Sequence, residues 1–147
     1  MIRVSIACPQ ETVSVDRSRL RDVARAVLDG EGVHEAEISL AVVDDSTIHQ
    51  LNRRYLDHDE PTDVLSFPLS EPTAKQLAGE LVIGGEVARR QADSRGHDVQ
   101  AELALYVIHG LLHLCGYDDN NAEAAAEMRQ RERHYLRQLG LPDIAPQ

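Results

Sequence analysis

The sequence predicts an α+β fold: a mixed sheet of about four strands, helices packed on it, and one buried helix at the centre. Four short apolar segments have the length and alternation of strands, at residues 2–7, 37–43, 64–69 and 80–83. Helical patterns separate them without the strict strand–helix repetition of a parallel α/β sheet. Residues 103–115 contain no Asp, Glu, Lys or Arg, and apolar residues fall on every face of the implied helix, so this helix is predicted to be buried.

Helix start and stop signals place the remaining elements. Asp16 and Asp98 are N-cap candidates, and glycines that follow the apolar stripes indicate helix ends. On this basis the helices are expected at residues 16–30, 46–55, 86–92, 98–115 and 121–139. Tyr55 is expected on the buried side of the second helix, and the Glu and Arg residues of the last helix are expected to face outward. The last two strands are expected to pair antiparallel across a long loop at residues 70–79, and residues 141–147 to form a frayed tail.

The length and composition fit one globular domain over residues 1–147, with 42% hydrophobic residues and mixed charge. The two cysteines, Cys8 and Cys115, give no disulfide framework, and residues 1–10 hold no apolar run of the length of a signal peptide. We therefore expect a cytoplasmic location. The apolar helix is shorter than the roughly 20 residues that cross a bilayer, so no membrane association is expected.

Two histidines four positions apart, His109 and His113, interrupt the apolar helix. On a helix they share one face, so their imidazoles can bind one metal ion. Gly116 then tolerates the positive φ of a helix end, and Asp119 completes the pattern H-x-x-x-H-x-x-G-x-x-D, with Asp118 as the alternative carboxylate. Burying two imidazoles is costly unless each has a polar partner, so the pattern favours a metal site over two separately hydrogen-bonded histidines.

The net charge of −10 argues mildly against a nucleic-acid ligand, because phosphate groups need local positive charge. Of the 15 basic residues only Lys75 is a lysine, and arginine suits bidentate phosphate contacts better than lysine does. A local basic patch is one interpretation of the arginines, and a solvated helix face is the other. The candidates for such a patch are Arg53, Arg54, Arg89, Arg90 and Arg95.

Two segments carry specific motifs. Residues 109–119 read HGLLHLCGYDD, and residues 51–68 read LNRRYLDHDEPTDVLSFP. They resemble the signatures H-G-x-L-H-L-x-G-Y-D-H and L-N-x-x-Y-R-x-x-D-x-P-T-D-V-L-S-F-P of the YbeY family, single-domain metal-dependent endoribonucleases of bacterial rRNA maturation. Weaker similarities lie at residues 79–83 and at Glu123, Met128 and Glu132.

The resemblance implies an α+β fold and one Zn²⁺ ion held by His109, His113 and Asp119. It also implies cleavage of single-stranded RNA near the 3′ end of small-subunit rRNA, with a wider role in ribosome quality control. The partners would be rRNA and the small ribosomal subunit. No catalytic residue beyond the metal site is identified in this way.

The sequence departs from the family pattern at two positions. Asp119 stands where the motif ends in histidine; aspartate can also bind zinc, but it lowers the net positive charge of the site. Leu56 stands where the motif has an arginine, the natural candidate to hold a substrate phosphate. We expect positive charge to be supplied from elsewhere in the cleft. The substrate-binding candidates are Arg54, His58, Arg89 and Arg90.

Two other functions compete with the nuclease. A metallopeptidase of the H-E-x-x-H type needs a glutamate general base after the first histidine, and Gly110 occupies that position here. A ribosome-assembly binding factor with a structural metal and weak or no nuclease activity is the stronger alternative, because the acidic charge, Leu56 and Asp119 all favour it. An RNA cleavage assay beside an Asp119→His variant separates this alternative from a nuclease.

Overall fold

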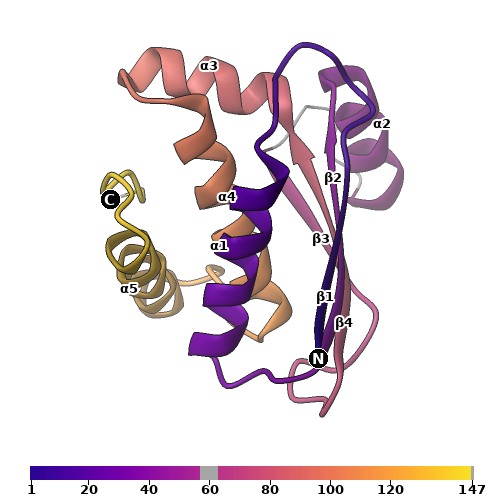
Figure 1. The fold of residues 1–147 in the computed structure, drawn as a ribbon, viewed down its shortest axis with the longest axis vertical. Helices are drawn as coiled ribbons and strands as arrows, with labels where there is room; N and C mark the ends of the chain where they lie inside the picture. The colour runs from indigo at the N-terminus through magenta and orange to yellow at the C-terminus, as the bar shows by residue number, and fades with distance from the viewer. Residues whose placement is uncertain (57–62, 147) are drawn as a thin grey trace.

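A mixed sheet of four strands is the base of the fold in the described residues, and helices lie on both of its faces (Figure 1). This computed structural model describes residues 1–56 and 63–146. The predicted α+β class and the mixed sheet are confirmed. The strands are β1 (Ile2–Ala7), β2 (Ala36–Val43), β3 (Val64–Pro68) and β4 (Leu77–Gly84), and the helices are α1 (Arg17–Gly30), α2 (Asp45–Leu56), α3 (Gly85–Arg95), α4 (Val99–Leu114) and α5 (Ala122–Gln138).

The strands lie in the order β1-β2-β4-β3. β1, β2 and β4 run parallel to one another, whereas β3 pairs antiparallel with β4, as predicted. β2 has a neighbour on each side, which agrees with its almost continuous apolar sequence. β4 begins at Leu77 and not at Glu80, because its first residues pair with the start of β2. The loop predicted at residues 70–79 is correspondingly shorter.

Helix α4 lies between the sheet and the outer helix α5, as the uncharged stretch from residue 103 onward predicts (Figure 1). Its apolar side chains are buried from Leu103 to Leu114, and His109 and His113 are only half-buried. α1 lies beside α4 on the same face of the sheet, and α3 also contacts α4. None of the described helices, α4 included, is both long and apolar enough to cross a membrane.

Helix α2 lies on the opposite face of the sheet (Figure 1), where Ile48 packs with Val43 and Leu65 in a second, small core. The prediction that Tyr55 is buried is wrong. Its side chain is 56% exposed, and its ring lies edge-on against Phe67 with 5.7 Å between the ring centroids. β3 is one of the two edge strands of the described sheet, so no further strand lies beyond it to cover the Tyr55 ring.

The predicted helix signals act as caps. The side chains of Asp16 and Asp98 accept hydrogen bonds from the first backbone N–H groups of α1 and α4. Gly96 ends α3 with φ 74°, and Gly116 follows α4 with φ 104°. Glycine has no Cβ and adopts such positive φ values without strain. Gly116 thereby reverses the chain toward α5 and brings Asp119 back to the side of α4 that carries the histidines.

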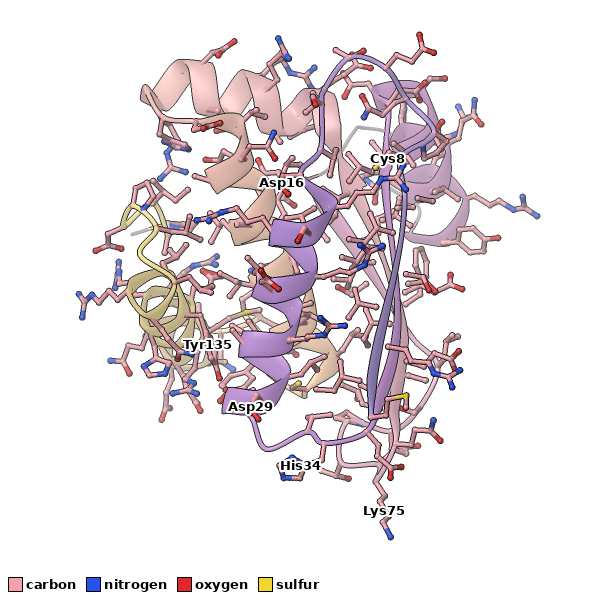
Figure 2. All side chains as sticks on the ribbon, viewed as in Figure 1. Cys8, Asp16, Asp29, His34, Lys75 and Tyr135 are labelled. Atoms are coloured by element: carbon pink, nitrogen blue, oxygen red, sulfur yellow. The ribbon has the colours of Figure 1, made fainter. Side chains whose placement is uncertain are left out.

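A polar cluster anchors α5 to the end of α1. Glu31 accepts hydrogen bonds from Nη2 of Arg131, at 2.6 Å, and from the hydroxyl of Tyr135. Gly30, the last residue of α1, leaves room for Tyr135, because a Cβ atom there would overlap its ring. Figure 2 shows Tyr135 where α5 faces the last turn of α1, near Asp29. The cluster fixes the rotation of α5 about its axis, and therefore which of its residues face α4.

The C-terminal tail packs against the domain, so the predicted frayed tail is wrong for the residues described. Ile144 and Ala145 are buried and belong to the main core. The carbonyl of Ile144 accepts a hydrogen bond from Nη2 of Arg95 at 2.5 Å. The burial of these two apolar side chains holds the tail against the domain, although the neighbouring prolines prevent a regular helix or strand there.

Ile144→Ala should lower the free energy of unfolding by about 2 kcal/mol, because it removes a buried side chain and leaves a cavity. Leu69→Ala is the matched control. Leu69 is 65% exposed, so its truncation should change this free energy by less than about 0.5 kcal/mol. Urea denaturation measures both variants. An Ile144→Ala variant as stable as the wild type would mean that the tail does not pack.

Candidate metal centre

Three side chains converge at the end of α4: His109 and His113 from one face of the helix, and Asp119 from the segment that leads to α5. Their ligand atoms lie within 4.8 Å of one another, so the group could hold a metal ion. Nε2 of His109 is 3.2 Å from Nε2 of His113, and the Asp119 carboxylate oxygens lie 4.0 and 3.9 Å from these two nitrogens. Asp118 is not in this group, and its Oδ1 instead accepts a hydrogen bond from the Asp119 backbone.

The chemistry of the donors fits a shared cation. Glu132 accepts a hydrogen bond from Nδ1 of His109 at 2.8 Å, so Nε2 of the neutral ring carries a lone pair. Two nitrogen ligands about 2.0–2.1 Å from a tetrahedral zinc ion lie about 3.3 Å apart. The two Nε2 atoms are 3.2 Å apart, which is close to this spacing.

Burial also favours the metal-binding form of His113. Loss of hydration lowers the pKa of His113, and the neighbouring His109 lowers it further, while Asp119 and Asp118 offset part of the shift. The neutral imidazole is the form that binds a metal. His113 is therefore biased toward that form by its surroundings.

A buried carboxylate and an arginine of α5 support the histidines. Glu132 is 0% exposed, which is costly for a charge without a partner. Nη1 of Arg129 donates to both of its oxygens, at 2.6 and 2.9 Å, and so satisfies that charge. Nη2 of Arg129 lies 4.0 Å from Oδ2 of Asp119. One guanidinium group therefore lies between the carboxylate that orients His109 and the carboxylate of Asp119.

The three converging residues lie between two hollows in the surface. A cleft of about 570 Å³ contains His109 and Asp119 and is lined by parts of α3, α4 and α5. A second hollow, of about 340 Å³, borders His109, His113 and the edge strand β3. His109 lines both hollows, so a ligand bound in either one meets its imidazole.

Acidic groups outnumber basic ones in the larger cleft. Glu102 is buried there and is paired with Nε2 of His97 at 2.6 Å and with Arg95 at 3.3 Å. A phosphate-bearing ligand can bind in this cleft only if the excess negative charge of the carboxylates is balanced. A divalent cation would balance it. The charged residues of the described lining are the four acids Asp63, Glu102, Asp119 and Glu132 and the two arginines Arg95 and Arg129.

The three described residues among those predicted to bind substrate, Arg54, Arg89 and Arg90, do not line the larger cleft. Arg89 donates to a backbone carbonyl in the loop before α1, and Arg90 forms an ion pair with Asp45 at 2.6 Å. Arg54 belongs to α2, which lies on the other face of the sheet from α4 (Figure 1). His58 lies outside the described residues. Within the described chain, these candidates and the three converging residues are not brought together.

Sequence reasoning missed Glu132 and Arg129 as members of the site. The expectation that the Glu and Arg residues of the last helix face outward is wrong for Glu132. Its spacing carried a signal, because it lies four residues after Met128 and four before Leu136, within the apolar stripe of α5. Arg95, one of the arginines of the predicted local patch, does line the cleft.

Gly110 faces the sheet and not the metal centre. A Cβ atom at this position would lie 2.8 Å from a methyl group of the buried Leu81 on β4. The residue that supplies the general base in H-E-x-x-H peptidases is therefore used here for close packing of α4 on the sheet. A side chain at this position could not serve the site, which argues against a peptidase of that type.

Glu132→Gln should weaken metal binding about 10- to 100-fold, because it removes the carboxylate that orients His109. Competition with a chelating dye measures the affinity of the metal-free proteins, and circular dichroism checks that the variants are folded. Glu127→Gln, at an exposed position of the same helix, is the control and should bind as the wild type does. Equal affinity of the Glu132→Gln variant and the wild type would mean that His109 binds metal without this support.

Known proteins share both the sequence and the fold. Residues 5–140 match the family model described as Endoribonuclease YbeY. Proteins of that name from Sulfurovum sp. (strain NBC37-1) and Pelotomaculum thermopropionicum are both 43% identical, over 138 and 142 residues, covering 90% of this chain and 88% and 93% of theirs. The solution structure of TM1509 from Thermotoga maritima has the same fold, with a TM-score of 0.63, 24% identity and 100% of each chain covered. The chain therefore belongs to the YbeY endoribonuclease family.

Proposed function

We propose that this chain is a metal-dependent endoribonuclease that cuts single-stranded RNA during rRNA maturation, near the 3′ end of the small-subunit rRNA. A wider role in ribosome quality control is part of the proposal. The observation that carries it is the convergence of His109, His113 and Asp119, with Glu132 orienting the first histidine. Membership of an endoribonuclease family supports the class of reaction.

Zn²⁺ is the proposed ion. Two imidazole nitrogens and a carboxylate oxygen are donors that zinc accepts, and catalytic zinc sites keep one position open beside three protein ligands. The side chains of His109, His113 and Asp119 are 18%, 28% and 37% exposed, which leaves a side open to substrate. A bound ion would polarise a phosphate oxygen and activate water. The chain itself would hold the ion, orients His109 and lowers the pKa of His113, which favours its neutral, metal-binding form.

The shape of the surface supports a single strand as substrate. His109 lines both hollows, and the proposed path of the strand runs from β3 past this residue into the larger cleft. A groove that follows the backbone is the usual form of a site for single-stranded nucleic acid. rRNA and the small ribosomal subunit are the proposed partners. A cytoplasmic location agrees with the two free cysteines, Cys8 and Cys115.

A binding factor that retains a structural metal is the second candidate. The excess of carboxylates in the larger cleft favours it, because these groups repel RNA unless a cation balances them. Aspartate at position 119 adds one of these charges where the family motif has a neutral ligand.

Zinc-loaded wild-type protein should cleave an unstructured oligoribonucleotide, and a chelator should stop the reaction. His113→Ala should abolish cleavage, because it removes a proposed ligand. His34→Ala is the control; His34 is exposed at the turn between α1 and β2 (Figure 2), and this variant should cleave as the wild type does. Gel analysis of labelled RNA measures the products.

The Asp119→His variant distinguishes the two candidates. A wild type that binds RNA without cutting it, beside an Asp119→His variant that cuts, would support the binding factor. Absence of cleavage by zinc-loaded wild type, by itself and with ribosomal subunits added, would reject the nuclease.

A further inference from the structure

We propose that Arg129 holds the phosphate group of the RNA bond that is cut, and so supplies the positive charge that Leu56 cannot. This inference rests on the proposed nuclease function and names the residue that contacts the substrate. Arg129 keeps its protons throughout, because its role is to donate hydrogen bonds to phosphate oxygens.

Arg129 lies at the edge of the metal centre that faces the larger cleft. Its Nη1 is 3.4 Å from Nδ1 of His109, and its Nη2 is 4.0 Å from Oδ2 of Asp119. All three residues line this cleft. A group that binds next to His109 and Asp119 from the cleft therefore meets the guanidinium group.

Part of this guanidinium group is available to a ligand. Within residues 1–56 and 63–146, its hydrogen bonds to carboxylates use Nη1 alone, which donates to Glu132. The 4.0 Å between Nη2 and Asp119 is beyond hydrogen-bond distance. Nη2 and Nε therefore keep N–H donors on one edge of the group. Two oxygens of one phosphate can accept from such an edge in the bidentate arrangement that arginine favours.

The other arginine of the described cleft lining is already engaged. Nη1 of Arg95 donates to Glu102 at 3.3 Å, and its Nη2 donates to the carbonyl of Ile144 at 2.5 Å. Arg90, outside the cleft, uses both Nη atoms on Asp45. Among the arginines described in the cleft, Arg129 is the one with a donor edge to offer.

The ion pair with Glu132 prepares Arg129 for this role. It holds the guanidinium group in place before substrate arrives, so binding needs little further ordering, and a preorganised donor is the more effective one. A metal ion would engage the carboxylate of Asp119 and leave Nη2 to another anion. The phosphate is the anion that the proposed reaction brings to this point.

The test compares Arg129→Gln and Arg129→Lys with Arg133→Gln. Arg133 lies one turn later on α5, pairs with Asp143 at 3.5 Å and is outside the cleft. kcat and KM are measured on a short oligoribonucleotide at saturating zinc. Arg129→Gln should lower kcat/KM about 100-fold or more through loss of a donor to the charged phosphate. Arg129→Lys should be intermediate, because it keeps the charge without the planar pair of donors. Arg133→Gln should match the wild type.

A second readout separates a phosphate contact from an indirect effect through Glu132 and His109. Zinc affinity and melting temperature are measured for each variant, so that activity is compared in folded, zinc-saturated protein. Cleavage is then measured at one linkage carrying a phosphorothioate in either diastereomeric form. Sulfur accepts hydrogen bonds poorly, so the wild type should be slowed selectively by one diastereomer. Arg129→Gln should lose this selective slowing.

Wild-type activity of Arg129→Gln at saturating zinc would overturn the inference. Lost activity with an unchanged phosphorothioate effect would also overturn it, because Arg129 would then act only by holding Glu132. If the wild type cleaves no RNA, the proposed function fails separately, and fluorescence anisotropy of the same oligonucleotide decides on Arg129. Weaker binding by Arg129→Gln but not by Arg133→Gln would support the contact, and no difference between them would reject it.

Discussion

The buried carboxylate of Glu132 connects the core of this fold to the candidate metal centre. A carboxylate without solvent exposure destabilises a protein by several kcal/mol unless its charge is paired and hydrogen-bonded. Here the partners are Nη1 of Arg129 on the same helix and Nδ1 of His109 on α4. α5 must therefore face α4 with one definite rotation, which the cluster of Glu31, Arg131 and Tyr135 at the end of α1 maintains.

Helix α4 sets the second condition, because a helix that has no charged residue after Glu102 and is buried on most sides has few places for polar side chains. His109 and His113 lie where the helix borders the two hollows. Gly110, between them, has no Cβ and so lets the helix lie close to β4. Gly116 then turns the chain at φ 104°, so that Asp119 returns to the histidines. The proposed ligand set therefore results from one helix, one turn and the carboxylate that orients the first imidazole.

The parts of this arrangement that local patterns encode could be predicted from the sequence. Strand alternation, N-caps and the spacing of His109, His113 and Asp119 depend on neighbouring residues. The four strands lie where alternation predicts them, although β4 begins three residues earlier, and the three predicted ligands lie close enough together to hold a metal ion. Glu132 and Arg129 could not be placed in the same way, since their contacts with α4 join residues about 20 positions apart and depend on the rotation of α5. The predictions for Tyr55 and for the C-terminal tail were wrong for the same reason. Whether an apolar side chain at the edge of the fold is buried depends on which other elements pack against it.

The net charge of −10 is compatible with a site for RNA because the local arrangement of charges governs binding. In the proposed function, a divalent ion at His109, His113 and Asp119 is the first requirement of that arrangement. The direct measurement is elemental analysis of zinc in wild-type protein and in Asp119→Ala after zinc loading and dialysis. We expect about one zinc ion per wild-type chain, the number that one set of three ligands holds, and much less in the variant. Wild-type protein that retains no zinc after loading would contradict the metal centre and the chemistry built on it.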